Sequence, residues 1–337
     1  MDSNSQLGVG VSGLGVGERH ARTINETEGA SLIKIYDPNI EKASALSIEL
    51  NTKACKSFND LILDERIDVI VVASPDHFHV KQIVEALKRG KHVFAEKPLC
   101  NTFDELKAIS NEWFKQSDKL KLYSNLILRE APIYKWLKKS IDEGLFGEIY
   151  SVDGDYLYGR KEKILKGWRG TGENYSGMKG GGIHMIDLMC WLTDQRPLSL
   201  STLGNNICTR HSNINISDFM STTFKFESGM VGRINANLGC VHRHQHVLRI
   251  FGTKATFIFD DKGPRIHFSS SPSHEATEVE LESLPSGKSD IVPIFLNAVK
   301  NNIDLKNKTK ETFDIVSIVI GCDEALLSGK EEEIIYL

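Results

Sequence analysis

The sequence predicts an α/β fold in which a doubly wound parallel sheet is followed by an α+β domain with a large, mostly antiparallel open sheet. Up to residue 124, apolar runs typical of buried strands alternate with segments of helical periodicity. Beyond that point the strands become longer, alternate with period two and are separated by glycines and polar turns. We therefore expect two domains, residues 1–124 and 125–337.

Composition excludes several classes of protein. The net charge is −4, from 41 basic and 45 acidic residues, so we expect no binding to nucleic acid. No apolar run is long enough to span a bilayer, and Met1 to Gln6 lack the features of a secretory signal, so we expect no membrane partner. The six cysteines are scattered without zinc-site spacing, which predicts reduced thiols and a cytoplasmic location.

The first strand, residues 7–11, leads into a glycine-rich turn and a helix. Glycines in such a turn let backbone N–H groups approach a pyrophosphate at the helix N-terminus, as in a Rossmann fold. The spacing is GxGxG, and Glu18 stands where GxGxxG has its third glycine. A plain strand–turn–helix connection is therefore the alternative. The candidate cofactor-binding residues here are Gly13, Leu14, Gly15, Val16 and Gly17.

The second strand, residues 31–36, ends at Asp37, 22 positions after Gly15. A Rossmann unit places a carboxylate at about this distance to accept hydrogen bonds from the adenosine ribose. The same charge repels a 2′-phosphate, so Asp37 favours NAD over NADP. The alternative is a turn residue before Pro38 and Asn39.

The alternation of strands and helices continues along the chain. In a parallel sheet the carboxyl ends of the strands meet at one edge, and ligands bind there. We expect helices at residues 40–50, 80–89 and 102–115, and strands at 67–73, 92–95 and 120–124. The strand ends are Gly13, Asp37, Ser74 with Pro75, and Lys97. At the last of these, Glu96 and Lys97 precede Pro98 after a buried strand; a solvated surface turn is the alternative to a site.

These stretches together resemble the Gfo/Idh/MocA family of NAD(P)-dependent oxidoreductases. The matching residues are the glycine turn with His20-Ala21, Asp37-Pro38, Ala73-Ser74-Pro75 with His77 and His79, Gly90 to Leu99, Gly144 to Ile149, and Gly167 to Arg169. The resemblance implies an NAD(P) cofactor, of which Asp37 favours NAD over NADP, and it adds Ser74, Pro75, His77, His79, Glu96 and Lys97 to the binding residues. In relatives the Lys-Pro bond is often cis.

The second half begins with an expected helix at residues 131–143. Strands are expected at residues 148–158, 217–226, 232–238, 244–252 and 255–260, an irregular loop at 261–290, helices at 290–301 and 311–328, and an edge strand at 332–337. The resemblance implies a homodimer or homotetramer formed through the outer face of this sheet.

His184 follows three glycines, Gly180 to Gly182, and opens an apolar helix. By itself this histidine is more typical of a core residue, but it matches the family's substrate-facing histidine. Many relatives carry an aspartate four residues earlier, where this chain has Gly180. Asp187 or Glu173 can supply the missing acid.

Three alternating histidines, His242, His244 and His246, can project from one strand face. Without a carboxylate or cysteine partner they are weak evidence for zinc, so we expect no metal site. Polar lining of a sugar pocket or dimer edge is the preferred interpretation.

Hydride transfer requires a group that takes the hydroxyl proton. Our hypothesis is that Lys97 orients and polarises the reacting oxygen while His184 acts as acid/base. The polar residues expected to contact substrate are Lys97, Asn125, Arg129, Tyr156, Arg160, Trp168, Arg169, Tyr175 and His184. They favour an NAD-dependent dehydrogenase of a sugar, polyol or nucleotide sugar; the alternatives are an NAD-using glycosidase with no net redox change and a non-catalytic NAD(P)-binding regulator.

Overall fold

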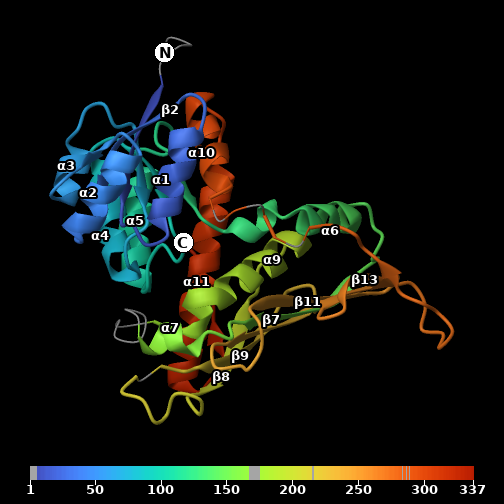
Figure 1. The fold of residues 1–337 in the computed structure, drawn as a ribbon. Helices are drawn as coiled ribbons and strands as arrows, with labels where there is room; N and C mark the ends of the chain where they lie inside the picture. The colour runs from blue at the N-terminus through green and yellow to red at the C-terminus, as the bar shows by residue number, and fades with distance from the viewer. Residues whose placement is uncertain (1–5, 167–174, 215, 283, 286, 288) are drawn as a thin grey trace. The chain divides into compact units, whose positions relative to one another are not determined.

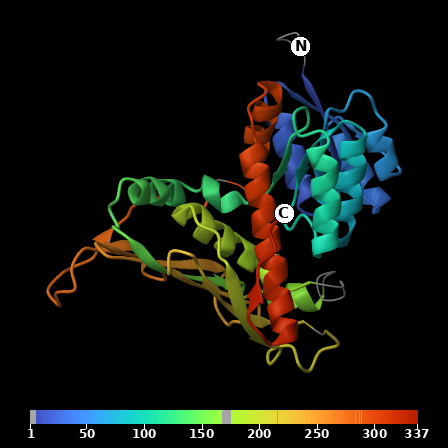
Figure 2. The same ribbon diagram turned by 180° about the vertical axis from the view of Figure 1, so that it is seen from behind.

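The computed structural model describes residues 6–166, 175–214, 216–282, 284–285, 287 and 289–337. Its contacts divide the chain into two compact units (Figures 1 and 2). Unit 1 comprises residues 1–125, 286–313 and 337, and unit 2 comprises residues 126–285 and 314–336. The division expected from sequence gives everything after residue 124 to the second domain, whereas the contacts return residues 286–313 to unit 1.

Unit 1 is built on a six-stranded, fully parallel sheet with the order β3-β2-β1-β4-β5-β6. Its central strands are short apolar runs with no exposed face, as expected for a sheet covered on both sides. The strands are β1 (Leu7–Ser12), β2 (Ala30–Tyr36), β3 (Lys53–Ala54), β4 (Val69–Val72), β5 (His92–Ala95) and β6 (Leu122–Ser124). The strand order reverses beside β1, which places the topological switch point there.

Several helices of unit 1 begin at side-chain N-caps. Thr102 and Glu105 form a capping box at the start of α5, and the Asn39 side chain accepts a hydrogen bond from the Lys42 amide in α2. The helices are α1 (Gly17–Glu26), α2 (Ile40–Glu49), α3 (Phe58–Ile62), α4 (His79–Lys88), α5 (Phe103–Phe114) and α10 (Ile291–Lys300). α10 belongs to this unit because it packs on α1 and β5, with Phe295 5.7 Å from the Phe94 ring.

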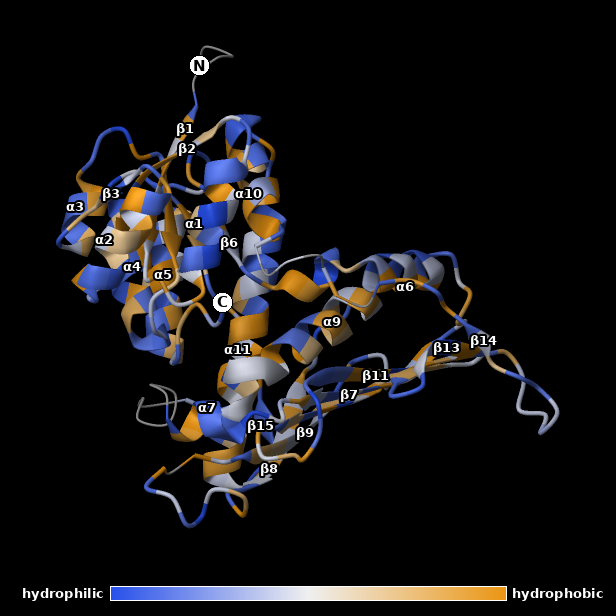
Figure 3. Ribbon diagram, in the orientation of Figure 1, coloured by the Kyte–Doolittle hydropathy of each residue, from blue (hydrophilic) through white to orange (hydrophobic). Residues whose placement is uncertain are grey.

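Unit 2 contains a nine-stranded sheet with the order β14-β13-β12-β11-β7-β10-β9-β8-β15. All its strand pairs are antiparallel except β7 with β10. The strands are β7 (Ile149–Leu157), β8 (Ser199–Asn205), β9 (Phe219–Lys225), β10 (Val231–Asn237), β11 (Gln245–Gly252), β12 (Thr256–Asp260), β13 (Gly263–His267), β14 (Thr277–Glu278) and β15 (Glu332–Glu333). Hydrophobic and hydrophilic residues alternate along this sheet (Figure 3).

Three features of this sheet differ from expectation. β13 and β14 lie in the segment expected to be irregular, because Gly263, at a φ of 87°, turns the chain back along β12. β8 had no predicted counterpart. The last strand is an edge strand, as expected, but covers only two residues.

One face of the sheet is packed against α9 (Ile183–Thr193), which Figure 1 shows running along β7 with α6 (Pro132–Asp142) beside it. The approach is close: a Cβ at Gly154 of β7 would lie 3.0 Å from Met185 Cε. α9 follows directly on a π-helical turn, η3 (Met178–Gly182). Within the described residues, the remaining helical segments are η1 (Asp76–Phe78), η2 (Ile127–Glu130), α7 (Lys161–Leu165) and α11 (Lys306–Ser328). Among the described residues, no helix combines the length and apolarity needed to cross a membrane.

A pH dependence of stability follows from His92 at the start of β5. Burial and the nearby charge of Lys121 lower the pKa of His92 from 6.5 to about 4, and its Nδ1 accepts a hydrogen bond from the Lys121 amide at 3.0 Å. Between these two pH values the unfolded chain binds more protons than the folded one, so stability is lost as the pH falls through this window.

We expect His92→Asn, whose side-chain oxygen can accept the same bond, to remove that contribution. Between pH 7.5 and pH 4.5, the free energy of unfolding in urea should fall by about 2 kcal/mol less in the variant than in the wild type. His211→Asn, at an exposed histidine, is the control and should follow the wild type. If the free energy of unfolding falls equally with pH in the wild type and in His92→Asn, the prediction is contradicted.

Candidate functional site

The glycine turn between β1 and α1 has room for a ligand at one glycine and none at another. Gly13 has a φ of 86°, and a Cβ there would lie 2.5 Å from the Ser74 amide nitrogen. A Cβ at Gly17 would lie 2.9 Å from the Ala73 Cβ, so this glycine permits close helix–sheet packing. At Gly15, by contrast, nothing lies within 4 Å of the Cβ position. A pyrophosphate therefore fits against the backbone at Gly15.

Asp37 lies at the same edge and holds this turn. Its Oδ2 accepts a hydrogen bond from the Leu14 amide at 2.7 Å, and its Oδ1 accepts one from the Asn39 amide at 2.8 Å. The second bond is that of a turn residue, as in the alternative interpretation from sequence, but the first ties the carboxylate to the glycine turn. These residues fit a dinucleotide whose ribose hydroxyls reach the carboxylate.

His79, expected to contact the cofactor, is fully buried in unit 1. Its Nε2 lies 2.8 Å from the Ser74 carbonyl oxygen and its Nδ1 lies 2.7 Å from that of Pro98. The ring therefore joins the loops that follow β4 and β5, which is a positioning role. His77, two residues earlier, is exposed and packs on the Phe78 ring.

Gln82 in α4 also has a positioning role, at the carboxyl ends of β1 and β4. Its Oε1 accepts hydrogen bonds from Ser12 Oγ at 3.1 Å and Ser74 Oγ at 3.0 Å. The ends of β1 and β4 are thereby tied together. Sequence reasoning missed Gln82 because an isolated glutamine in an amphipathic helix carries no distinguishing pattern.

Glu96, directly after β5, is held by two side chains. His20 Nε2 lies 2.8 Å from Glu96 Oε1, and Asn125 Nδ2 donates to the same oxygen at 2.8 Å. Burial alone would raise the pKa of the Glu96 carboxyl, but the bond and charge of His20, the charge of Lys97 and the bond from Asn125 hold it below its usual value. Lys97 is therefore next to a carboxylate that stays ionised. The Lys97-Pro98 bond is cis, as the resemblance implied.

In unit 2 two of the three glycines before His184 make room for the protein's own tyrosines. A Cβ at Gly180 would lie 2.1 Å from the Tyr175 hydroxyl, and a Cβ at Gly181 would lie 1.9 Å from Tyr156 Cε1. The phenol of Tyr175 thus occupies the space of a side chain at position 180. In a helix, positions 180 and 184 lie on one face, so this hydroxyl is on the side of His184.

An aromatic cluster lies beside His184. The His246 ring is 6.2 Å from it in an edge-to-face arrangement, and His246 in turn lies 5.0 Å from His244 and 5.5 Å from Tyr156. The register explains this, because His246 of β11 pairs directly with Tyr156 of β7. Within the described part of the chain, no group of three or more His, Cys, Asp or Glu side chains is arranged to hold a metal ion.

Asp187, a candidate for the acid beside His184, forms a buried ion pair with Arg129. Both of its carboxylate oxygens accept hydrogen bonds from the guanidinium, at 2.6 to 3.1 Å. This pair connects η2 to α9. Arg160, another expected substrate contact, is exposed and lies over the Tyr158 ring. Trp168, Arg169 and Glu173 lie outside the described residues.

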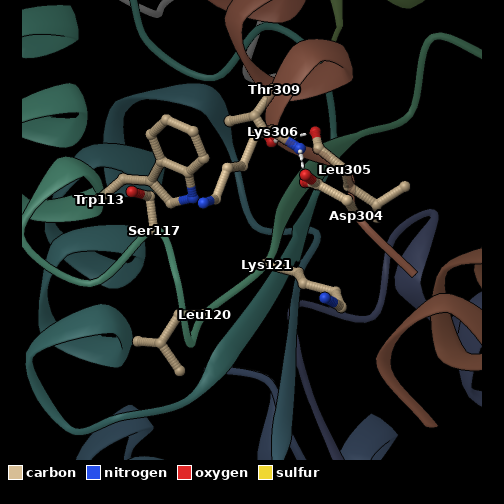
Figure 4. A pocket seen from close by; sticks show the side chains of 8 residues that line it. All are labelled: Trp113, Ser117, Leu120, Lys121, Asp304, Leu305, Lys306 and Thr309. Atoms are coloured by element: carbon tan, nitrogen blue, oxygen red, sulfur yellow. Dashed lines mark hydrogen bonds between the residues drawn. The ribbon is translucent and has the colours of Figure 1, made fainter. Parts of the chain in front are cut away.

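A small hollow in unit 1 is not part of this site. It is lined by Trp113, Ser117, Leu120, Lys121, Asp304, Leu305, Lys306 and Thr309 (Figure 4). Leu120 and Lys121 directly precede β6, so the hollow lies at the amino ends of the strands. Ligands of doubly wound sheets bind at the opposite edge.

Comparison with protein families decides the class. Residues 7–123 match the model of an oxidoreductase family with an NAD-binding Rossmann fold, and residues 134–258 match the C-terminal domain of the same family. The chain belongs to the Gfo/Idh/MocA oxidoreductase family. Unit 1 therefore contains the family's NAD-binding fold, and NAD is the cofactor that the glycine turn and Asp37 fit.

Individual relatives of this Gfo/Idh/MocA protein are distant. The chain is 24% identical over 256 residues to 2,7-anhydro-N-acetylneuraminate hydratase of Escherichia coli K12, covering 75% of this chain and 68% of that one. It is 23% identical over 261 residues to inositol 2-dehydrogenase of Rubrobacter xylanophilus, covering 75% and 71%. A structure of levoglucosan dehydrogenase in complex with NADH superposes with a TM-score of 0.86 at 19% identity, over 99% and 100% of the chains, and shows the shared fold.

The two glycines of the turn give a matched test of the NAD site. Gly15→Ala should leave the melting temperature within about 2 °C of wild type, because its Cβ meets nothing, but weaken NAD binding by roughly tenfold where the phosphates approach. Gly13→Ala should lower the melting temperature by more than about 5 °C, because its φ is positive and its Cβ meets the Ser74 backbone. Calorimetric titration with NAD and thermal unfolding measure both. Unchanged NAD affinity in Gly15→Ala would contradict the placement of the pyrophosphate.

Proposed function

We propose that this protein is an NAD-dependent dehydrogenase that transfers hydride between the nicotinamide and a hydroxyl-bearing carbon of a sugar, polyol or nucleotide sugar. The observation that carries the proposal is the ionised, doubly held Glu96 beside Lys97 at the carboxyl end of β5. Family relatives named as inositol and levoglucosan dehydrogenases support the choice of a polyhydroxylated substrate.

Lys97 is the residue that we assign to the reacting oxygen. NAD, when bound, supplies the hydride acceptor. The Lys97 ammonium donates a hydrogen bond to the substrate hydroxyl and stabilises the negative charge that grows on this oxygen as its proton leaves. Glu96 holds the positive charge of Lys97 in place without taking its proton, because its pKa is lowered.

His184 is the residue that we assign to the proton transfer. It is only partly buried, at the start of α9, and its ring is fixed on one side by His246. A neutral imidazole accepts the hydroxyl proton during oxidation and returns it during reduction. The Tyr175 hydroxyl on the same helical face is the group that we assign to the space of the absent acid at position 180.

Substrate binding extends this proposal to neighbouring residues. Asn125 already donates one N–H to Glu96, and Tyr156 is 6% exposed, so each offers the substrate only a small part of its surface. Trp168 and Arg169 are proposed contacts on the basis of the sequence. Arg129 is assigned to Asp187 instead, because it holds both carboxylate oxygens there.

A second candidate function is an NAD-using reaction without net redox change. The similarity to a hydratase favours it, since hydration exchanges water rather than hydride. A glycosidase or a non-catalytic regulator would share the same NAD site. Net NADH formation distinguishes the dehydrogenase from all of these.

We further propose that the protein acts in the cytoplasm as a homodimer or homotetramer. The sheet face opposite α9 carries ion pairs between neighbouring strands, Arg233 with Asp153 at 2.8 Å and Arg249 with Asp155 at 3.1 Å. This charged face supports the proposal of pairing with a second copy.

The oligomer can be tested by light scattering after size-exclusion chromatography. We expect a dimer or tetramer for the wild type and a larger monomer fraction for Arg233→Glu, which places like charges on Asp153 and its neighbours. Lys56→Glu, on the surface of unit 1, is the control. A monomeric wild type at micromolar concentration would contradict the proposal.

The catalytic proposal is tested with Lys97→Met. NADH formation from a panel of inositols, anhydrosugars, aldoses and nucleotide sugars should identify a substrate for the wild type, and on it the variant should lose roughly 100-fold or more in kcat. NAD affinity should stay within about threefold, since Met keeps most of the length of the side chain. Lys88→Met, at the exposed end of α4, is the control. Near-wild-type kcat in Lys97→Met would refute the role of Lys97, and product formation without NADH would favour the second candidate.

A further inference from the structure

Glu18 stands at the third-glycine position of the turn and makes ionic contacts there. It lies in the first turn of α1, with Oε1 3.1 Å from an Arg22 nitrogen and Oε2 3.2 Å from Lys42 Nζ. Hydrogen bonds from Arg22 and Lys42 lower the pKa of the Glu18 carboxyl, so it is ionised at neutral pH. Neither the NAD site nor the catalytic proposal uses this carboxylate.

Lys42 places a positive charge at the glycine turn, where Asp37 also binds. Its Nζ donates a hydrogen bond to the Leu14 carbonyl oxygen at 2.5 Å, while the Leu14 amide donates to Asp37. The ammonium and the carboxylate therefore hold the same residue of the glycine turn. Arg22 has a further partner in Glu49, so the Glu18 carboxylate is the acid that balances Lys42.

We propose that Glu18 is a second determinant of cofactor choice, because it neutralises Lys42, a cation that contacts the turn beside Asp37. The pyrophosphate is common to NAD and NADP, but only NADP carries an additional phosphate on the adenosine ribose, at the position that Asp37 faces. A lysine released from Glu18 would attract that phosphate. Glu18 and Asp37 thus act together against NADP, one by neutralising a cation and the other by repulsion.

The proposal rests on the dinucleotide site of the proposed function and not on its substrate. Binding of NAD and NADP can therefore be measured without a turnover assay. The side chains of Glu18 and Lys42 are 35% and 39% exposed, so the expected effects are those of a partly solvated ion pair.

The experiment measures the dissociation constants of both dinucleotides by isothermal titration calorimetry. Glu18→Gln should bind NADP roughly three- to tenfold more tightly than wild type, with less than a twofold change for NAD. Glu41→Gln is the matched control: it removes the same charge from the residue beside Lys42, but adjacent helical positions do not face each other. It should change neither constant more than twofold.

The double variant Glu18→Gln/Lys42→Met tests the route of the effect. It should lose the gain in NADP affinity, and the gain in the single variant should shrink as salt is raised, because a released lysine is screened. Equal changes for NAD and NADP in Glu18→Gln, or a gain that persists without Lys42, would overturn the proposal. Thermal unfolding establishes that each variant is folded. If the wild type binds neither dinucleotide, the dinucleotide site itself is refuted, independently of the substrate assays.

Discussion

The largely buried Glu96 carboxylate, whose side chain is 13% exposed, is the interaction on which the NAD-binding edge of unit 1 depends. It follows β5, accepts from His20 of α1 and accepts from Asn125 after β6, so it joins three elements at one oxygen. Removing one partner of a buried charge typically costs about 3 to 5 kcal/mol, because the remaining charge loses its compensation. The edge is therefore held by polar contacts, in addition to the apolar core beneath the strands. The residue directly after this carboxylate is Lys97.

In unit 2, side-chain packing holds the surroundings of His184 in place. Here the backbone before His184 carries no side chains for three residues, and Tyr175 and Tyr156 lie against Gly180 and Gly181. A π-helical turn, rare in proteins and frequent at functional sites, precedes α9 at this point. Aromatic rings have few rotatable bonds, so the wall around His184 loses little further entropy when a ligand binds. The two units thus hold Lys97 and His184, the residues that we propose to act in catalysis, by different means.

The parallel sheet was predictable because its signals are local. Apolar runs, Asn39 and Thr102 as helix caps, and Gly13 at a positive φ each follow from a short stretch of sequence. The packing of α10 in unit 1 could not be predicted from local signals. It depends on contacts such as Phe94 with Phe295, which are about two hundred positions apart in the chain. β13 is a similar case, because a strand of Gly, Pro and Arg forms only when β12 offers a partner.

Within the candidate site, the contacts that a residue makes were harder to predict from the sequence than its place in the fold. His79 carries a recognisable position, yet its burial between two carbonyl oxygens gives it a positioning role that no pattern reveals. Asp187 lies at helical spacing from His184, but Arg129, 58 positions earlier, engages both of its oxygens. Side chains at one helical turn are able to meet; which of them do so depends on the competing partners that tertiary structure supplies.

Acidic side chains at an edge that binds a pyrophosphate require their own explanation. Asp37, Glu18 and Glu96 would each weaken the binding of an anion if they were isolated charges. Each instead accepts hydrogen bonds from the protein: Asp37 from two backbone amides, Glu18 from Arg22 and Lys42, and Glu96 from His20 and Asn125. These donors compensate the charge before any ligand arrives, so little reorganisation remains when the ligand binds. This compensation is consistent with the roles that we propose for these acids, which are to select among ligands and to orient them without general repulsion of the dinucleotide.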